Sequence, residues 1–122
     1  MNGAHELHYI VLRYAPMLLS DDGLNLGLVL FDPREVEDGY CNVSFFSNWQ
    51  SKVLRFDPEA DIEMLEAITQ DIERRLTCKE TRWEMLHLME DSFSNMIRVS
   101  VRQECRTQDS ALEFATLLQQ FS

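Results

Sequence analysis

The sequence predicts an α+β fold in a single domain, residues 1–122, with an antiparallel sheet of about four strands and helices packed mainly on one face. Three observations indicate it. The first half carries short runs rich in β-branched and aromatic residues, separated by turn signals. The second half carries apolar residues at helical spacing behind helix-capping residues. One late segment alternates apolar and polar residues, as a half-buried strand does. The expected order is βββααβα, without linker or repeat.

Three strands are expected in the first half. Residues 8–14 form a β-branched and aromatic run that Pro16 ends. Residues 24–31 follow the turn signal at Ser20–Gly23, and their apolar residues fall on both parities, so both faces should be covered. Residues 40–46 follow an Asp-Gly turn. The short turns predict an antiparallel meander.

A first helix is expected from the Asp57-Pro58 pair onward, because Asp caps free N–H groups and Pro fits the first helical turn. Its apolar stripe has spacings of three and four: Ile62, Leu65, Ile68, Ile72 and Leu76. Two further helices are expected behind matches to the S/T-x-x-E capping box, at Thr81–Glu84 and at Ser110–Glu113. The first of these two should run to about Glu90.

One strand, residues 96–106, is expected between the last two helices. Its apolar residues share one face: Ile97, Val99, Val101 and Cys105. The other face carries a row of three arginines: Arg98, Arg102 and Arg106. The row could bind phosphate or an acidic partner. Pairing with acids of the same chain is the favoured interpretation, because the chain has a surplus of acids.

The charge balance limits the partners. The chain has 21 acidic and 11 basic residues and a net charge of −10, which opposes ordinary binding to DNA, RNA or anionic lipid. No apolar run approaches the ~20 residues of a membrane span, and no signal peptide is expected. The three cysteines form no CxxC pair and are expected as reduced thiols in the cytoplasm.

Sequence motifs favour no enzyme, metal or cofactor. The chain has no P-loop, no GxSxG and no GxGxxG. His5 and His8 are three apart, with no Cys or carboxylate cluster of ligand spacing nearby, so no metal site is expected. No cysteine has a patterned histidine close by, so a catalytic thiol is not expected.

A row of carboxylates runs along one side of the first predicted helix: Glu59, Glu63, Glu66 and Glu73. One hypothesis is a phosphate mimic that occupies a nucleic-acid-binding groove. The favoured alternative is the solvated face of an amphipathic helix.

Two residues interrupt the predicted strands. Arg13 stands in an apolar strand, and a buried guanidinium needs a carboxylate or carbonyls, for which Asp61 is the favoured partner. The alternative is a polar site. Gly27 inside a strand marks a close approach. An aromatic side chain over the bare backbone, Trp49 or another, is favoured over a ligand or partner.

Four ordered motifs resemble a bacterial domain-of-unknown-function family, number 3037, over nearly the whole chain. The motifs are Tyr9-x-x-x-Arg13-Tyr14-x-Pro16, Asn25-x-Gly27-x-Val29-Leu30, Phe56-Asp57-Pro58-x-Ala60-Asp61 and Ser92-Phe-Ser94-Asn95-x-Ile97-x-x-Ser100. The resemblance implies a small cytoplasmic bacterial protein without an assigned activity, and a kinase-like companion of the HipA type as a partner. The positions that match the family pattern are Arg13, Asn25, Gly27, Asp61, Ser92 and Asn95.

The leading expectation is a non-enzymatic interaction protein, an accessory or regulatory subunit that acts through protein contacts. One alternative is an acidic inhibitor that mimics nucleic acid. The other is an enzyme or small-ligand binder in which Arg13, Asn25, Asp61 and Asn95 converge on a cleft.

Overall fold

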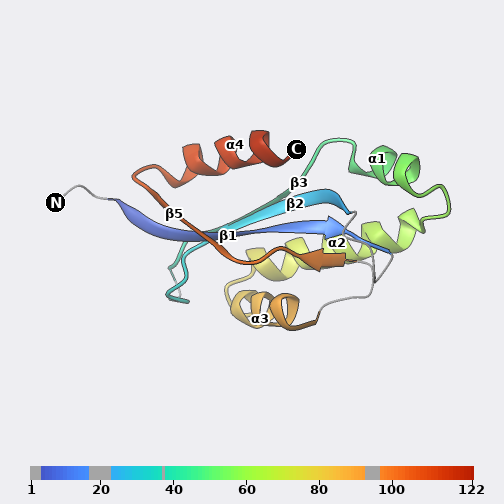
Figure 1. Ribbon diagram of the computed structural model, residues 1–122. Coiled ribbons are helices and arrows are strands. Elements are labelled where there is room, and N and C mark those ends of the chain that lie inside the picture. Colours follow the sequence, from blue (N-terminus) through green and yellow to red (C-terminus); the bar gives the residue numbers. More distant parts are fainter. Residues whose placement is uncertain (1–3, 17–22, 37, 93–96) are drawn as a thin grey trace.

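The computed structural model describes residues 4–16, 23–36, 38–92 and 97–122, except the side chains of 91 and 92 (Figure 1). It confirms the α+β class and the antiparallel sheet. The elements in chain order are β1 (His5–Tyr14), β2 (Leu24–Phe31), β3 (Cys41–Phe45), α1 (Trp49–Phe56), α2 (Ile62–Thr77), α3 (Arg82–Ser92), β4 (Ile97–Val99), β5 (Gln103–Thr107) and α4 (Ser110–Phe121).

Strand β1 lies at the centre of the sheet. It pairs with β2 along one edge, and β2 pairs with β3, so the predicted meander is confirmed. Along its other edge β1 pairs with β5 over His5–Tyr9 and with β4 over Leu12–Tyr14. All of these pairings are antiparallel, and the strand order is β3-β2-β1-β4 with β5 beside β4 on β1.

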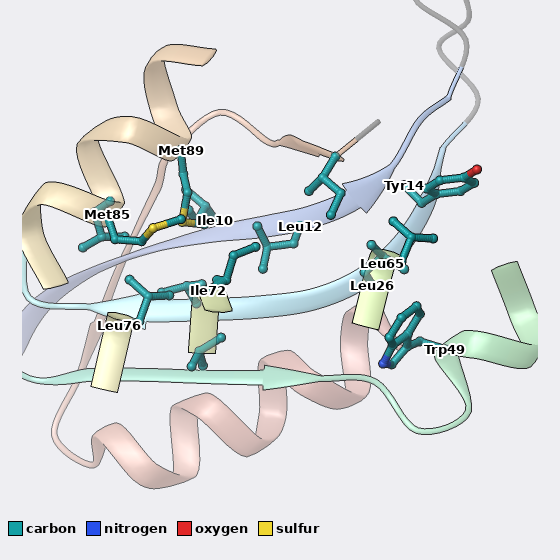
Figure 2. Packing of buried hydrophobic residues seen from close by; sticks show 14 of the residues in the cluster. Ile10, Leu12, Tyr14, Leu26, Trp49, Leu65, Ile72, Leu76, Met85 and Met89 are labelled. Carbon is teal, nitrogen blue, oxygen red and sulfur yellow. The ribbon is translucent and has the colours of Figure 1, made fainter. Parts of the chain in front are cut away.

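The alternation of β1 side chains builds two cores. Ile10, Leu12 and Tyr14 pack into the larger core, which α1, α2 and α3 complete (Figure 2). Leu7 and Val11 point the other way and pack with Phe114 and Leu117 of α4. Most helices therefore cover one face, as predicted, while α4 covers the opposite face of the sheet (Figure 1).

The predicted strand 96–106 is two strands, because a bulge divides it. Val99 lies opposite Leu12 and Gln103 opposite Tyr9, so the three residues 100–102 face only two residues of β1. At the bulge the Ser100 hydroxyl accepts a 2.9 Å hydrogen bond from the backbone N–H of Val11. The extra residue reverses which face the later side chains occupy.

The predicted row of three arginines is therefore wrong. Arg98 lies opposite Arg13 on the α4 face, whereas Arg106 lies opposite Glu6 on the other face. Arg102 pairs with Glu90, and Arg106 lies 3.7 Å from Glu6. For these two arginines, pairing with acids of the same chain is what the structure shows.

The helix boundaries differ from prediction at the capping residues. Helix α1 was not expected; only Trp49 and Val53 of its eight residues are buried. Asp57 follows α1 as its C-cap. The N-cap of α2 is Asp61, four residues later, whose carboxylate accepts from the N–H of Met64. In the same way Asp109, not Ser110, caps α4.

Arg82 is a buried cation that the sequence patterns did not reveal. Its Nε donates a 2.7 Å hydrogen bond to the carbonyl of Leu76 in the last turn of α2. Its Nη1 donates to the carbonyl of Gly39 at 3.2 Å. A cation at a helix C-terminus is stabilised by the free carbonyl groups there, and this one joins α3 to α2 and to the turn before β3.

Gly27 permits a close approach, as predicted, but the aromatic residue is Phe45. A Cβ atom at position 27 would lie 2.7 Å from Cδ1 of Phe45 and 2.8 Å from the carbonyl oxygen of Ser44. The carbonyl belongs to the backbone of β3 and cannot rotate away. The bare backbone therefore sets how closely β2 and β3 pack.

We expect Gly27→Ala to lower the free energy of unfolding by about 1–3 kcal/mol, as overpacked cores do. Gly23→Ala is the matched control, because its Cβ would meet its nearest atoms at 3.3–3.4 Å, two of them in the Arg13 side chain. It should cost less. Urea denaturation of the three proteins measures both values; a Gly27→Ala protein as stable as the parent would contradict the packing role.

Candidate functional site

Two of the candidate residues come together at one end of the sheet. Arg13 on β1 is directly opposite Asn25 on β2, and Arg98 on β4 is opposite Arg13 on the other side. We call these three residues the arginine–asparagine row. Because directly paired residues share a face, the row lies on the α4 side of the sheet. Asn25 donates a 3.0 Å hydrogen bond from Nδ2 to the carbonyl of Phe121 at the end of α4.

Arg13 does not pair with Asp61, so that prediction is wrong. Arg13 points to the α4 face, whereas α2 covers the opposite face. Asp61 is exposed and caps α2. Arg13 is half-buried and donates from Nη2 to the carbonyl of Gly23 at 3.2 Å. Its Nε is buried without a hydrogen-bond partner in the described part of the chain.

The remaining candidate residues do not complete a site with Arg13 and Asn25. The ring of Phe45 fills the space next to Gly27, which leaves no room there for a ligand. Ser92 ends α3, but its side chain, like the whole of Asn95, lies outside the described residues. The described geometry thus joins Arg13 and Asn25 only, and Asn25 already serves to hold α4 on the sheet.

A second surface combines exposed apolar and acidic side chains. Residues 54–63, which we call the acidic corner, run from the end of α1 into α2 beyond the end of the sheet (Figure 1). Leu54 and Phe56 are 43% and 45% exposed. The same ten residues contain one arginine and four acids, which are Asp57, Glu59, Asp61 and Glu63.

Tyr14 fixes the acidic corner to the core. Its ring is buried at the end of β1, and its hydroxyl donates a 2.7 Å hydrogen bond to Oδ2 of Asp57. Oδ1 of Asp57 accepts from the N–H of Glu59, and its carbonyl accepts from the N–H of Ala60. The ring of Phe56 meets Tyr14 edge-on, with centroids 6.3 Å apart. The exposed side chains of the corner therefore stand on a fixed backbone.

The pKa of Tyr14 reflects this arrangement. Burial raises it first, and the hydrogen bond to the Asp57 carboxylate adds to the effect, so that the pKa is about 12. Burial and that hydrogen bond both favour the neutral phenol. Sequence reasoning placed Asp57 at the start of a helix and gave Tyr14 no role, because only the folded chain brings the two side chains together.

The predicted carboxylate row begins at Glu59, before α2, and continues along α2 to Glu73. Glu59 and Glu63 are exposed, and Glu66 is half-buried. Further along the helix, Arg74 and Arg75 both pair with Asp71. The strongest negative charge therefore coincides with the acidic corner.

The cysteines are free, as predicted for Cys41, Cys78 and Cys105. Burial raises the pKa of Cys41 to about 11 and also raises that of Cys105. Cys78 is exposed, and hydrogen bonds from Glu80 and Thr81 lower its pKa. Among the described helices, none has the length and apolar character needed to cross a membrane.

We expect the Tyr14 phenol to ionise near pH 12, detected as the change in absorbance at 295 nm that Tyr14→Phe removes. Because the folded pKa is above the ordinary value of about 10, its contribution to stability is complete below pH 10 and is lost as the pH rises toward 12. The difference in unfolding free energy between the parent and Tyr14→Phe should shrink over that range.

The control for this titration is Tyr9→Phe, since the Tyr9 ring packs against Phe121 instead. A phenol at position 14 that ionises near pH 10 would contradict both the burial of the ring and its hydrogen bond to Asp57.

The comparisons with known proteins identify a family and no activity. No curated protein and no solved structure matches the chain significantly. One family model, described as Protein of unknown function (DUF3037), matches residues 9–121 and so takes in both the arginine–asparagine row and the acidic corner. The resemblance drawn from the four sequence motifs is thereby confirmed. The chain belongs to the DUF3037 family.

Proposed function

We propose that this protein is a non-enzymatic interaction module, an accessory or regulatory subunit, and that it docks a protein partner on the acidic corner. One observation carries the proposal: Leu54 and Phe56 are 43% and 45% exposed, and the seven residues that follow them in the chain, 57–63, carry four carboxylates. Apolar side chains at the centre of a charged rim are the usual arrangement of a protein-binding surface.

The chemistry of the corner selects its partner. Four acids against one arginine favour a partner surface rich in lysine and arginine. Phe56, which precedes Asp57 in the chain, needs an apolar cavity to fill, and buried aromatic side chains commonly supply much of the binding energy. The fitting partner is therefore a basic protein surface with an apolar centre.

Preorganisation supports the same role. The hydrogen bond from Tyr14 to Asp57 holds the corner against the end of β1 before any partner arrives. Ordering a loop on binding costs free energy, and a corner already held in place avoids much of that cost. Because Tyr14 holds the acidic corner in place, less of the binding free energy of Leu54 and Phe56 is lost to ordering the backbone.

The other two hypotheses have less support. A nucleic-acid mimic would need a long row of carboxylates, but Arg74 and Arg75 place two positive charges in the later part of α2, where both pair with Asp71. A ligand site of Arg13, Asn25, Asp61 and Asn95 would need Asp61 on the α4 face, whereas Asp61 caps α2.

The proposal also covers the cellular compartment and the kind of partner. A bacterial cytoplasm and a HipA-type kinase-like partner follow from the family resemblance, and the net charge of −10 speaks against direct contact with nucleic acid or anionic membranes. A kinase-like partner would have to present a basic surface with an apolar centre to fit the corner.

We expect the double variant Leu54→Ser/Phe56→Ser to weaken the binding of its partner at least about tenfold, and Glu59→Lys/Glu63→Lys to do the same. The partner is first captured from the source cells and identified by mass spectrometry. The dissociation constants are then measured with purified proteins by calorimetry. Leu112→Ser on α4 is the matched control, because Leu112 is 64% exposed and remote in sequence from the corner.

Equal affinities for the parent and both corner variants would overturn the proposal. Loss of binding in the charge-reversed variant alone, together with a partner that binds nucleic acid, would favour the mimic instead. A change in affinity with Leu112→Ser only would move the interface to α4.

A further inference from the structure

Three side chains of metal-ligand type meet at the opposite end of β1 from the acidic corner. Glu6 and His8 are two residues apart on β1 and so share a face, and Glu104 of β5 is directly opposite His8. His8 Nε2 lies 3.4 Å from Oε2 of Glu6 and 3.9 Å from Oε1 of Glu104. One ligand atom from each of the three residues lies within 4.8 Å of the others.

The imidazole of His8 is held in place with one nitrogen left over. The side chain is 13% exposed, and its ring meets Phe31 edge-on, with centroids 6.1 Å apart. The Nδ1 atom lies 3.5 Å from Nη1 of Arg102. The Nε2 atom is buried, faces the two carboxylates and makes no hydrogen bond within the described part of the chain. A buried polar atom without a partner is costly, and a bound group would satisfy it.

We propose that Glu6, His8 and Glu104 bind a divalent first-row transition cation such as Zn²⁺. Bonds of about 2.0–2.2 Å to a tetrahedral ion place ligand atoms roughly 3.3–3.6 Å apart. The His8–Glu6 separation of 3.4 Å fits this range, and Glu104, 3.9 Å from His8, would have to move closer by a few tenths of an ångström. An imidazole nitrogen with two carboxylates suits Zn²⁺ or Mn²⁺ better than Ca²⁺ or Mg²⁺, which prefer oxygen ligands alone. Three protein ligands leave a coordination position for water or an external group.

The neighbouring charges are compatible with a cation. Arg102 is held by the carboxylate of Glu90 and stacks over Phe31, its Cζ 4.9 Å from the ring centroid. A cation on Nε2 would leave the imidazole proton on Nδ1, which faces a guanidinium N–H donor 3.5 Å away, so Arg102 would have to move away from Nδ1 while its bonds to Glu90 are kept. Arg106 lies 3.7 Å from Glu6 and is 73% exposed, so it can turn into solvent.

The two carboxylates are exposed to solvent, and the one on Glu104 comes from a distant part of the sequence, which is why the sequence predicted no such site. Glu6 also lines a surface cavity of about 310 Å³, so its carboxylate can be reached from solvent. The sequence expectation rested on the absence of a carboxylate cluster of ligand spacing near His8. The register between β1 and β5 supplies Glu104 from the far end of the chain.

The experiment is a titration of the full chain with Zn²⁺ in competition with a chromophoric chelator, in the presence of a non-thiol reductant. We expect one Zn²⁺ per chain, lost in His8→Gln and weakened at least about tenfold in Glu104→Gln. Glu104 is 74% exposed, so its variant folds as the parent does even if His8→Gln does not. His87→Gln is the matched control: His87 is 61% exposed and lies on α3 beside Glu35, and this variant should bind as the parent does.

Imidazole NMR gives a second readout. Zn²⁺ should shift the nitrogen resonance of His8 Nε2 and leave the nitrogen resonances of His87 unchanged. A dissociation constant for Zn²⁺ above about 100 μM in the parent protein would overturn the proposal. Unchanged affinity in Glu104→Gln, or equal loss in His87→Gln, would also overturn it, because the ion would then bind elsewhere.

Discussion

The structure depends on one strand that is covered on both faces and paired along both edges. Ile10, Leu12 and Tyr14 of β1 lie in the larger core, and Leu7 and Val11 lie in the smaller core beneath α4. Both edges of the strand carry hydrogen-bonded partners. The three residues Ile10, Val11 and Leu12 of β1 are apolar and buried, and the polar side chains of the strand lie on either side of them.

The two ends of β1 lead to two different surfaces. At the first end, Glu6 and His8 share a face with a carboxylate from β5. At the other end, the phenol of Tyr14 reaches from the core to Asp57 and fixes the acidic corner. Arg13 points to the opposite face, toward Asn25 and the end of α4. The alternation of a single strand thus assigns each polar residue to a surface.

Local patterns predicted what local forces determine. The alternating and β-branched runs located β1, β2 and β3, and the apolar stripe from Ile62 to Leu76 located α2. Errors of a few residues arose at helix starts, where two capping signals compete. Asp57 and Asp61 both resemble N-caps, but Asp57 is the C-cap of α1 and accepts from Tyr14, which leaves Asp61 to cap α2.

Features that depend on pairing between distant segments were not predictable. At the bulge of residues 100–102 the Ser100 hydroxyl accepts from the N–H of Val11, and the bulge moves Arg106 to the opposite face from Arg98. The predicted ion pair between Arg13 and Asp61 was wrong because the sequence does not show which face of the sheet α2 covers. The trio of Glu6, His8 and Glu104 likewise requires the register of β5.

Hydrogen–deuterium exchange of the protein, alone and with its captured partner, tests the central claim most directly. Binding at the acidic corner should slow exchange in residues 54–63, where the backbone N–H groups of Glu59 and Ala60 bond to Asp57. Exchange in α4 should remain as it is in the free protein. Slower exchange confined to α4 or to β3, with residues 54–63 unchanged, would contradict the account.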